Sequence, residues 1–262
     1  PVISYYLIVP RPSRSTLFTD TTRFRSVYNT LTVPVRERFQ LVLADGTKVF
    51  LNSGSEMRYP ERFGKARREV FLKGEAWFEV AKDSAREFWV HAGAMDVKVL
   101  GTSFNVKAYE RLETVATTLV EGSVEVACAG KSFQIVPGEQ FVYDKNNRVM
   151  DVRMVDTESY VSWKDGYYKF RQTTLEEIME TLSVWYGLNV FYVNESAKQV
   201  EFTGKVRRYE DARMLLDKFE QTGDVVFDIK GNNVFITIKQ KKPFAREWNS
   251  FLVKARGMVW QS

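Results

Sequence analysis

The sequence is poor in the residues that build disulfides and metal sites. Its 262 residues include one cysteine, Cys128, and one histidine, His91. A single cysteine excludes an intrachain disulfide, and no His/Cys cluster has metal-site spacing. A Ser-His-Asp or Cys-His catalytic site would have to use His91, which lies on an expected strand where a structural role is favoured. We therefore expect no cofactor, no metal and no turnover site.

The sequence also has no long apolar run and no strong charge. No run reaches the ~18 residues that a membrane helix needs, so we expect a membrane anchor to be absent from this chain. Apolar residues make up 44% of the sequence, which is typical of a globular protein. The net charge is +5, and the cations are interspersed with acids. The densest basic run, residues 62–68, is interpreted as a solvated hairpin edge, so we expect no nucleic acid partner.

Residues 97–106 stand out among the expected strands. Four apolar residues alternate with small or polar ones: Val97, Val99, Phe104 and Val106. This period of two predicts a strand on each side of a tight turn at Gly101. Thr102 places a hydroxyl directly after that glycine, so a strained Gly101–Thr102 bond could be attacked by its own side chain. An ordinary β-turn is the simpler interpretation of the chemistry alone.

Residues 37–155 carry a β pattern throughout. Short alternating segments are separated by turn signals such as Asp45-Gly46 and Asn146-Asn147. Many short strands with no helical stretch predict an antiparallel β-sandwich, a roll or a short solenoid. The fold class is therefore mainly β here, with an α+β part to follow.

The pattern changes after residues 156–165, which we interpret as a linker. Thr174 and Glu177 form a capping box that opens a helix, and Gly187 is placed to end it. A second helical stripe runs from Ala212 to Phe219. Residues 166–240 are therefore expected to form a small β-α-β-β-α-β-β domain, with two helices on one face of a small sheet.

The two ends of the sequence are weakly patterned. Residues 1–36 are rich in Ser, Thr and Arg without a sustained period, and we interpret them as a disordered or foreign leader. Residues 241–262 form a basic tail. A frayed end or a short docking helix is all that its pattern predicts.

Several short motifs occur in a fixed order that resembles one family. They are LADGTKV (43–49), REV (68–70), GEAWFEV (74–80), VLGTSFNV (99–106), LVEGSV (119–124), PGEQ (137–140) and WKDG (163–166). The first six resemble the periplasmic domain of FecR-family proteins. The last, with the α+β part, resembles the C-terminal domain of the Bacteroidetes type, which is similar to the short signalling domains of TonB-dependent transducers and secretins.

This resemblance implies an anti-sigma factor anchored in the inner membrane. In the family, an N-terminal segment holds an extracytoplasmic-function (ECF) sigma factor, and a membrane helix and a periplasmic sensor follow. The sensor binds the signalling domain of an outer-membrane TonB-dependent transducer. We expect the sigma-binding segment and the membrane helix to be missing from the present sequence. We therefore expect it to be the periplasmic part, which reaches the sigma factor only through the missing segment.

The resemblance also bears on the site residues. Some members cleave themselves at a Gly-Thr bond in this motif, with Thr102 Oγ as nucleophile and the Gly101 carbonyl as electrophile. For the transducer, we expect an exposed edge strand of the C-terminal domain to accept a partner strand. Six residues on two strands are candidates, unless both strands are interior: Leu188, Val190, Tyr192, Val234, Ile236 and Ile238.

Two other classes of function remain open at this stage. The first is an extracellular carbohydrate-binding or adhesive β-sandwich. Four aromatic residues could form a glycan platform, although core packing is favoured for them: Trp77, Phe78, Phe88 and Trp89. The second is an enzyme acting on external substrates, which the missing catalytic residues disfavour beyond a single self-cleavage.

Overall fold

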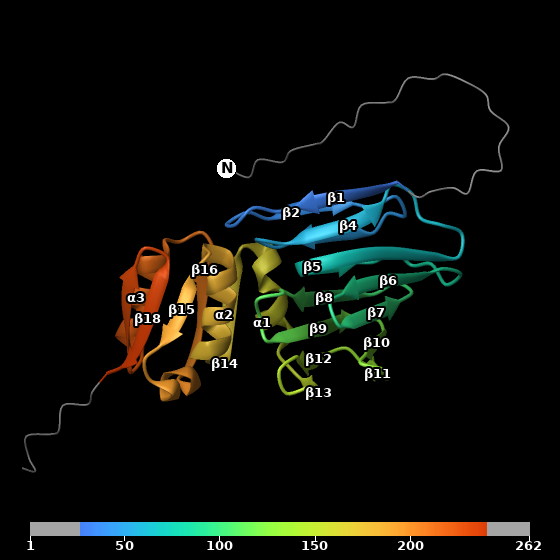
Figure 1. The fold of residues 1–262 in the computed structure, drawn as a ribbon. Coiled ribbons are helices and arrows are strands. Elements are labelled where there is room, and N and C mark those ends of the chain that lie inside the picture. The colour runs from blue at the N-terminus through green and yellow to red at the C-terminus, as the bar shows by residue number, and fades with distance from the viewer. Residues whose placement is uncertain (1–26, 240–262) are drawn as a thin grey trace, which may run out of the picture.

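The computed structural model describes residues 27–239, which form a β-rich part and a smaller α+β part (Figure 1). Each part has its own apolar core. Residues 1–26 of the predicted leader and the predicted tail at 241–262 lie outside the described residues. We call the β-rich part the sensor domain, after the role that the resemblance implies for it, and the α+β part the C-terminal domain.

The sensor domain consists of two sheets that share one long strand. The first sheet has the order β1 (Tyr28–Thr32), β4 (Glu56–Pro60), β5 (Arg67–Glu79), β6 (Glu87–Ala92), β7 (Met95–Val99), β10 (Val124–Cys128) and β11 (Lys131–Ile135). The second sheet has the order β2 (Phe39–Val42), β3 (Lys48–Leu51), β5, β8 (Ser103–Ala108), β9 (Thr114–Glu121), β12 (Glu139–Asp144) and β13 (Val149–Met154). Apolar side chains of both sheets form one core. Among strands β1–β13, the pair β5–β6 is parallel and the others are antiparallel, so the predicted sandwich is confirmed with this one exception.

Strand β5 passes from one sheet to the other at Gly74. Its first half pairs with β4 and β6, and its second half pairs with β3 and β8. Gly74 has a left-handed φ of +107°, and a Cβ there would lie 2.7 Å from the Cα of Ser55. Glycine is required because both the backbone conformation and the neighbouring chain exclude a side chain.

Part of the predicted leader belongs to the sensor domain. Strand β1 lies within residues 1–36 and pairs with β4 along its whole length. Val33, which follows the strand, is buried in the core, and Leu31 packs against that core. The prediction was wrong from residue 28 onward because this short edge strand has no strong alternation of its own.

The predicted linker is helical. Residues 156–165 contain helix α1 (Thr157–Val161) and a 3₁₀ helix, η1 (Ser162–Asp165). Asp156 caps α1 by accepting a hydrogen bond from the backbone of Glu158 at 3.3 Å. Trp163 is buried in the core of the C-terminal domain, so these residues join the domains as packed structure.

The C-terminal domain has the predicted order of elements. They are β14 (Tyr167–Thr174), α2 (Leu175–Tyr186), β15 (Asn189–Tyr192), η2 (Glu195–Gln199), β16 (Glu201–Arg207), α3 (Ala212–Thr222), β17 (Val225–Lys230) and β18 (Asn233–Ile238). Thr174 caps α2 and Gly187 ends it in a left-handed conformation, as predicted.

The strands of this domain form two small sheets instead of one. β14 pairs with β16, and β15-β18-β17 form a separate three-stranded sheet. Phe219 of α3 contacts Phe170 and Phe202 of the first of these sheets, while α3 also packs against β17. Helix α2 packs against β14 and β15. The helices therefore lie between two sheets, and the prediction of both helices on one face of a single sheet was wrong.

The aromatic residues considered for a glycan platform are mostly interior. Phe78 and Phe88 lie in the core of the sensor domain, and Trp77 is buried against the C-terminal domain. Trp89 is half-buried. These four residues cannot form one exposed platform, which confirms core packing for three of them.

The requirement for glycine at β5 can be tested by stability. We expect Gly74→Ala to lower the free energy of unfolding by roughly 3 kcal/mol, because it adds a steric overlap to a left-handed backbone. Gly231→Ala is the matched control, since Gly231 has φ +61° with open space around it. It should cost about 1 kcal/mol. Equal losses of unfolding free energy for the two variants in urea would contradict the packing explanation.

Candidate functional site

The predicted cleavage bond, Gly101–Thr102, lies where the chain crosses from the first sheet to the second. Strand β7 before it pairs with β6 and β10, and strand β8 after it pairs with β5 and β9. Both predicted strands are confirmed, but they do not pair with each other. A break at this bond would leave each strand held by two neighbours.

Glycine is required at position 101 because a neighbouring residue lies close to it, and not because the backbone is left-handed there. A Cβ on Gly101 would lie 2.6 Å from Lys82 Cγ and 2.8 Å from Lys82 Cα. The φ of Gly101 is outside the left-handed region. Any larger residue would push residue 82 away from the turn.

Thr102 is buried and held by hydrogen bonds. Its Oγ1 donates to the carbonyl of Ser123 at 3.0 Å, and its own carbonyl accepts from the backbone of Val80 at 3.0 Å. A Cβ on Gly122 would approach Thr102 Oγ1 to 2.8 Å. The hydroxyl that would act as nucleophile therefore has one fixed position.

Arg68 is a residue of this region that the sequence reasoning missed. It was assigned to a solvated edge, but its side chain is fully buried and pairs with Asp45 at 2.8 Å. It also donates to the carbonyls of Ala81 at 2.8 Å and Leu100 at 3.4 Å. Arg68 therefore joins the β2–β3 hairpin to the backbone just before Gly101.

One of the two predicted docking strands is interior. β18 is the central strand of its sheet, in parallel with β15 and antiparallel with β17. Val234 and Ile236 are completely buried, and Ile238 packs partly against the same core. The prediction of an exposed edge at these three residues was wrong, because sheet order depends on pairing between distant segments.

The other predicted strand, β15, is at the edge but is covered. Leu188, just before it, is buried, while Val190 and Tyr192 pack partly against the core. The 3₁₀ helix η2 contacts β15, and Lys198 of η2 lies 5.4 Å from the ring centre of Tyr192. Burial, reinforced by the charge of Glu176, raises the pKa of Tyr192 well above its ordinary value.

Strand β17 is the second edge, which the sequence reasoning did not consider. The backbone of Lys239 donates to Asp224 at 2.7 Å, so the even-numbered residues of β17 bond to β18. The backbone groups of Val225, Phe227 and Ile229 then point to the free side. Within residues 27–239, β17 has no second strand partner.

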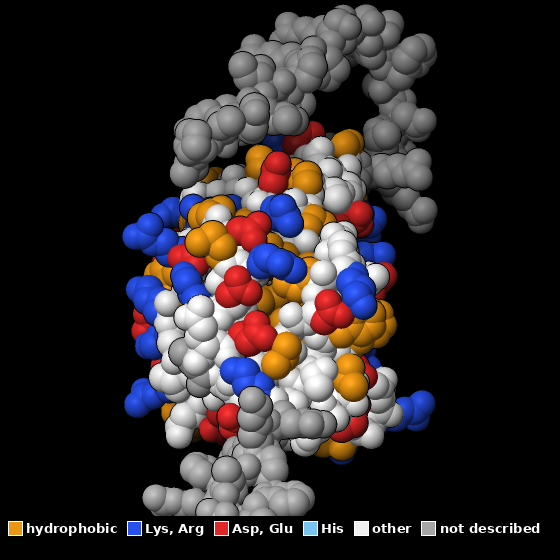
Figure 2. Space-filling view, turned by 90° about the vertical axis from the view of Figure 1, so that its left-hand side faces the viewer, with side chains coloured by type: hydrophobic (Ala, Val, Ile, Leu, Met, Phe, Trp, Pro, Cys, Tyr) orange, Lys and Arg blue, Asp and Glu red, His pale blue; other side chains and the backbone are white. Residues whose placement is uncertain are grey.

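The side chains along β17 are also incompletely covered. Val225 is fully buried, whereas Phe227 and Ile229 on the same face are half-buried, and Val226 on the other face is 38% exposed. Figure 2 looks onto this end of the molecule and shows apolar side chains exposed between basic and acidic ones. An added strand would bury the inner row and satisfy the free backbone groups.

The two domains are joined by a buried chain of polar side chains that starts at Glu75 of β5. Its carboxylate accepts from Asn52 Nδ2 at 2.6 Å and from Asn105 Nδ2 at 2.9 Å. Asn105 Oδ1 accepts from Trp163 Nε1 at 3.1 Å, and Asn52 Oδ1 accepts from Arg208. All five side chains are buried. The sensor domain thus contacts both η1 and the loop before α3.

Arg208 carries a full charge into this junction with no exposed surface. Its guanidinium carbon lies 3.6 Å from the ring centre of Trp185, and Nη1 donates to the carbonyl of Trp163 at 3.0 Å. Glu75 is connected to this charge through Asn52. The arrangement is favourable only while both domains supply their groups, because a buried charge without partners is costly.

The loop between β1 and β2 contacts the same side of the C-terminal domain. The guanidinium of Arg36 lies 5.7 Å from the ring centre of Tyr186, at the end of α2. Arg38 Nη1 donates to the carbonyl of Lys164 in η1. The loop therefore connects the first strand of the sensor domain to the domain that carries β17.

Both parts of the chain match known families in sequence. The family described as FecR protein matches residues 29–125, and the family described as FecR, C-terminal matches residues 167–236. The chain belongs to the FecR family of anti-sigma factors. No functionally curated protein has detectable sequence similarity to it.

Solved structures agree with the FecR assignment. Two crystal structures of a candidate anti-sigma factor from Parabacteroides distasonis ATCC 8503, at 1.65 and 2.50 Å resolution, each give a TM-score of 0.73 with 27% identity. The matches cover 81% and 82% of this FecR chain and 100% of the solved chains. Across residues 27–239, no helix is long and apolar enough to cross a membrane.

The importance of Arg208 for the junction can be tested by unfolding. We expect Arg208→Ala to lower the free energy of unfolding by about 3 kcal/mol and to separate the unfolding of the two domains into two transitions. Arg207→Ala is the matched control, because the adjacent arginine is exposed, and it should change stability by less than about 0.5 kcal/mol. Equal effects of the two variants in calorimetry would contradict this role.

Proposed function

We propose that this chain is the periplasmic sensor of a membrane-anchored FecR-family anti-sigma factor. It relays the state of an outer-membrane TonB-dependent transducer to an ECF sigma factor held by an upstream segment of the protein. The observation that carries this proposal is a C-terminal domain of the FecR type with an uncovered edge strand, β17, in its three-stranded sheet, fixed to the sensor domain by buried polar contacts.

The signalling domain of the transducer docks by adding a strand to β17. Backbone hydrogen bonds on the free side of Val225, Phe227 and Ile229 provide affinity, and the half-buried side chains of Phe227 and Ile229 provide an apolar surface. Strand β15 is a poorer acceptor because η2 contacts it and Lys198 covers Tyr192. We therefore place the docking site on β17 instead of on β15 or β18, the two strands that the sequence favoured.

Docking of the transducer's signalling domain affects the upstream segment through the β1–β2 loop. Arg36 and Arg38 hold this loop against α2 and η1. Within residues 27–239, strand β1 pairs only with β4 and is mostly exposed, so its pairing is among the weaker ones in the sensor domain. A shift of the C-terminal domain on docking therefore changes the stability of β1, to which the upstream segment is attached.

Charged substitutions on the two edge strands test the docking site. We expect Ile229→Lys on β17 to weaken binding of the signalling domain of a genome-neighbouring transducer at least tenfold, a loss of about 1.4 kcal/mol. Val190→Lys on β15 is the control, since Val190 is also half-buried on the inner face of an edge strand. Its binding in calorimetry should be unchanged.

The reverse result would place docking on β15. Wild-type protein that binds no such signalling domain would count against the transducer relay itself. Circular dichroism of both variants checks that neither loss reflects unfolding.

We further propose that the protein cleaves itself once, at Gly101–Thr102. Thr102 Oγ attacks the Gly101 carbonyl carbon, the C–N bond breaks, and an ester and the free amine of Thr102 form. Water then hydrolyses the ester, which releases the Gly101 carboxylate and restores the hydroxyl. The step rests on the direct succession of Gly101 and Thr102, and it requires the hydroxyl to leave the Ser123 carbonyl to which it donates. The two fragments stay together through the strand pairs of β7 and β8.

Intact mass under denaturing conditions tests self-cleavage. We expect two fragments from the wild type, one beginning at Thr102, and a single chain from Thr102→Ala. Ser103→Ala is the control, because it removes the adjacent hydroxyl and should leave cleavage unchanged. A single full-length mass for the wild type would exclude cleavage and leave the docking proposal intact.

A further inference from the structure

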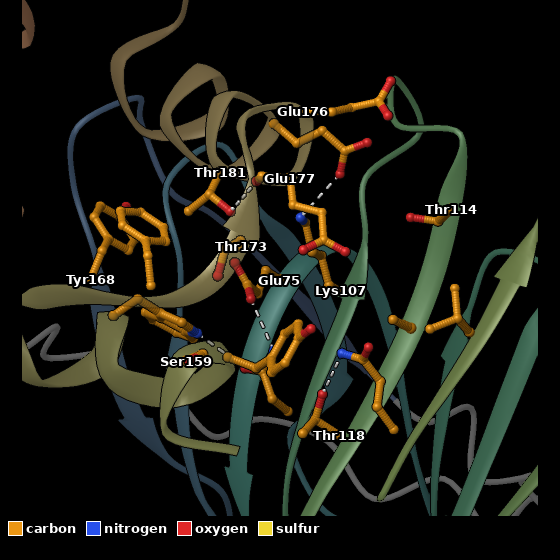
Figure 3. A pocket seen from close by; sticks show the side chains of 18 of the residues that line it. Glu75, Lys107, Thr114, Thr118, Ser159, Tyr168, Thr173, Glu176, Glu177 and Thr181 are labelled. Carbon is orange, nitrogen blue, oxygen red and sulfur yellow. Dashed lines mark hydrogen bonds and ion pairs between the residues drawn. The ribbon is translucent and has the colours of Figure 1, made fainter. Parts of the chain in front are cut away.

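A cavity of about 350 Å³ lies between the two domains, beside the polar junction (Figure 3). Its floor is the outer face of the second sheet of the sensor domain. Asn105, Thr118, Gln140 and Arg153 occupy one cross-strand row of this floor, on β8, β9, β12 and β13. Ala116 lies in the next cross-strand row, and its small side chain leaves space above the sheet there.

The opposite wall comes from α1, η1, β14 and α2. Four aromatic rings line it: Tyr160, Trp163, Tyr168 and Phe170. Hydroxyl groups of Thr173 and Thr181 line it as well (Figure 3). The volume is at the lower end of the range for small-molecule sites in proteins, which is roughly 300–1,000 Å³.

Two buried hydroxyl groups in the wall, that of Tyr168 and Ser159 Oγ, make no hydrogen bond of standard geometry among the described residues. The Arg208 guanidinium is the nearest polar neighbour of the Tyr168 hydroxyl, whereas Ser159 Oγ has none of this kind. Tyr168 is 3% exposed as a residue. Burial raises its pKa well above the ordinary tyrosine value, so the hydroxyl stays protonated and can donate. Buried polar groups normally find a partner, so these two indicate a missing one.

The cations that line the cavity are already paired, and carboxylates outnumber them in the lining. Lys107 lies 3.4 Å from Glu180, and Arg153 lies 3.5 Å from Glu177 and donates to Gln140 at 3.1 Å. No unpaired cation is left to hold an anion, and within residues 27–239 no group of His, Cys, Asp and Glu could hold a metal ion. A neutral ligand with several hydroxyl groups fits a wall of rings, amides and free hydroxyls.

We propose that this cavity binds a neutral polyhydroxylated compound of monosaccharide size, which hydrogen-bonds to Tyr168 and Ser159 and packs against the aromatic wall. The ligand contacts both domains at once, so it would stabilise their present arrangement. This site is separate from β17, and the proposal does not depend on transducer docking.

Saturation-transfer NMR with D-glucose, D-galactose, D-mannose and N-acetyl-D-glucosamine tests the proposal on the whole chain. We expect transfer from the wild-type protein to at least one of these sugars at millimolar concentration. Ala116→Phe should abolish it, because the ring fills the floor of the cavity. Ala85→Phe is the matched control on an exposed loop and should leave transfer unchanged.

A second variant separates binding from general damage to the fold. Tyr168→Phe keeps the ring and removes one unpaired hydroxyl, so it should weaken sugar binding two- to tenfold. Thermal unfolding without sugar checks that each variant is folded. The cavity holds only water, and the proposal is wrong, if no sugar responds or if Ala116→Phe responds as the wild type does.

Discussion

The buried charge of Arg208 is the constraint on which the arrangement of the two domains depends. A guanidinium without exposed surface needs partners, and the C-terminal domain supplies a carbonyl, aromatic rings and the nearby Tyr168 hydroxyl, all of them uncharged. The remaining partner, Asn52, is in the sensor domain and is itself bound to Glu75. Such a network adds little net stability, but all of its hydrogen bonds can form in only one relative position of the two domains. We infer that it determines how the domains sit and not mainly how strongly they adhere.

Three separate features follow from this fixed arrangement. The β1–β2 loop reaches α2 and η1, so the first strand of the sensor domain is coupled to the C-terminal domain. Helices α1 and α2 cover the outer face of the second sheet, and the interdomain cavity lies between them and the sheet. Strand β17 belongs to a small sheet that the sensor strands do not extend, and Asp228 and Lys230 are the only charged residues on it. Charges of this kind limit unwanted pairing while leaving the edge open to a specific partner.

The sequence predicted those parts of the fold that depend on neighbouring residues. The cap at Thr174 and the left-handed end at Gly187 are local, and both were confirmed. The alternation around Gly101 was also sufficient to place β7 and β8. The central position of β18 could not be predicted, because it depends on a parallel partner far away in the sequence.

The missed residues had no local signal either. Arg68 stands in a basic run, and only the fold brings Asp45 to it from a different hairpin. Residues 156–165 lack a helical period, yet burial of Trp163 orders them. Arg208 and Glu75 likewise show no pattern in the sequence, so the polar junction was invisible before the structure. Sequence similarity identified the family, whereas the positions of its surfaces required the fold.

Hydrogen–deuterium exchange of the chain with and without the transducer's signalling domain tests the central claim most directly. The account predicts slower exchange at the amides of Val225, Phe227 and Ile229, which face the docked strand, together with a changed rate in the β1–β2 loop and β1. Protection confined to β17 and its neighbours, with β1 and its loop unchanged, would contradict the proposed coupling through the junction.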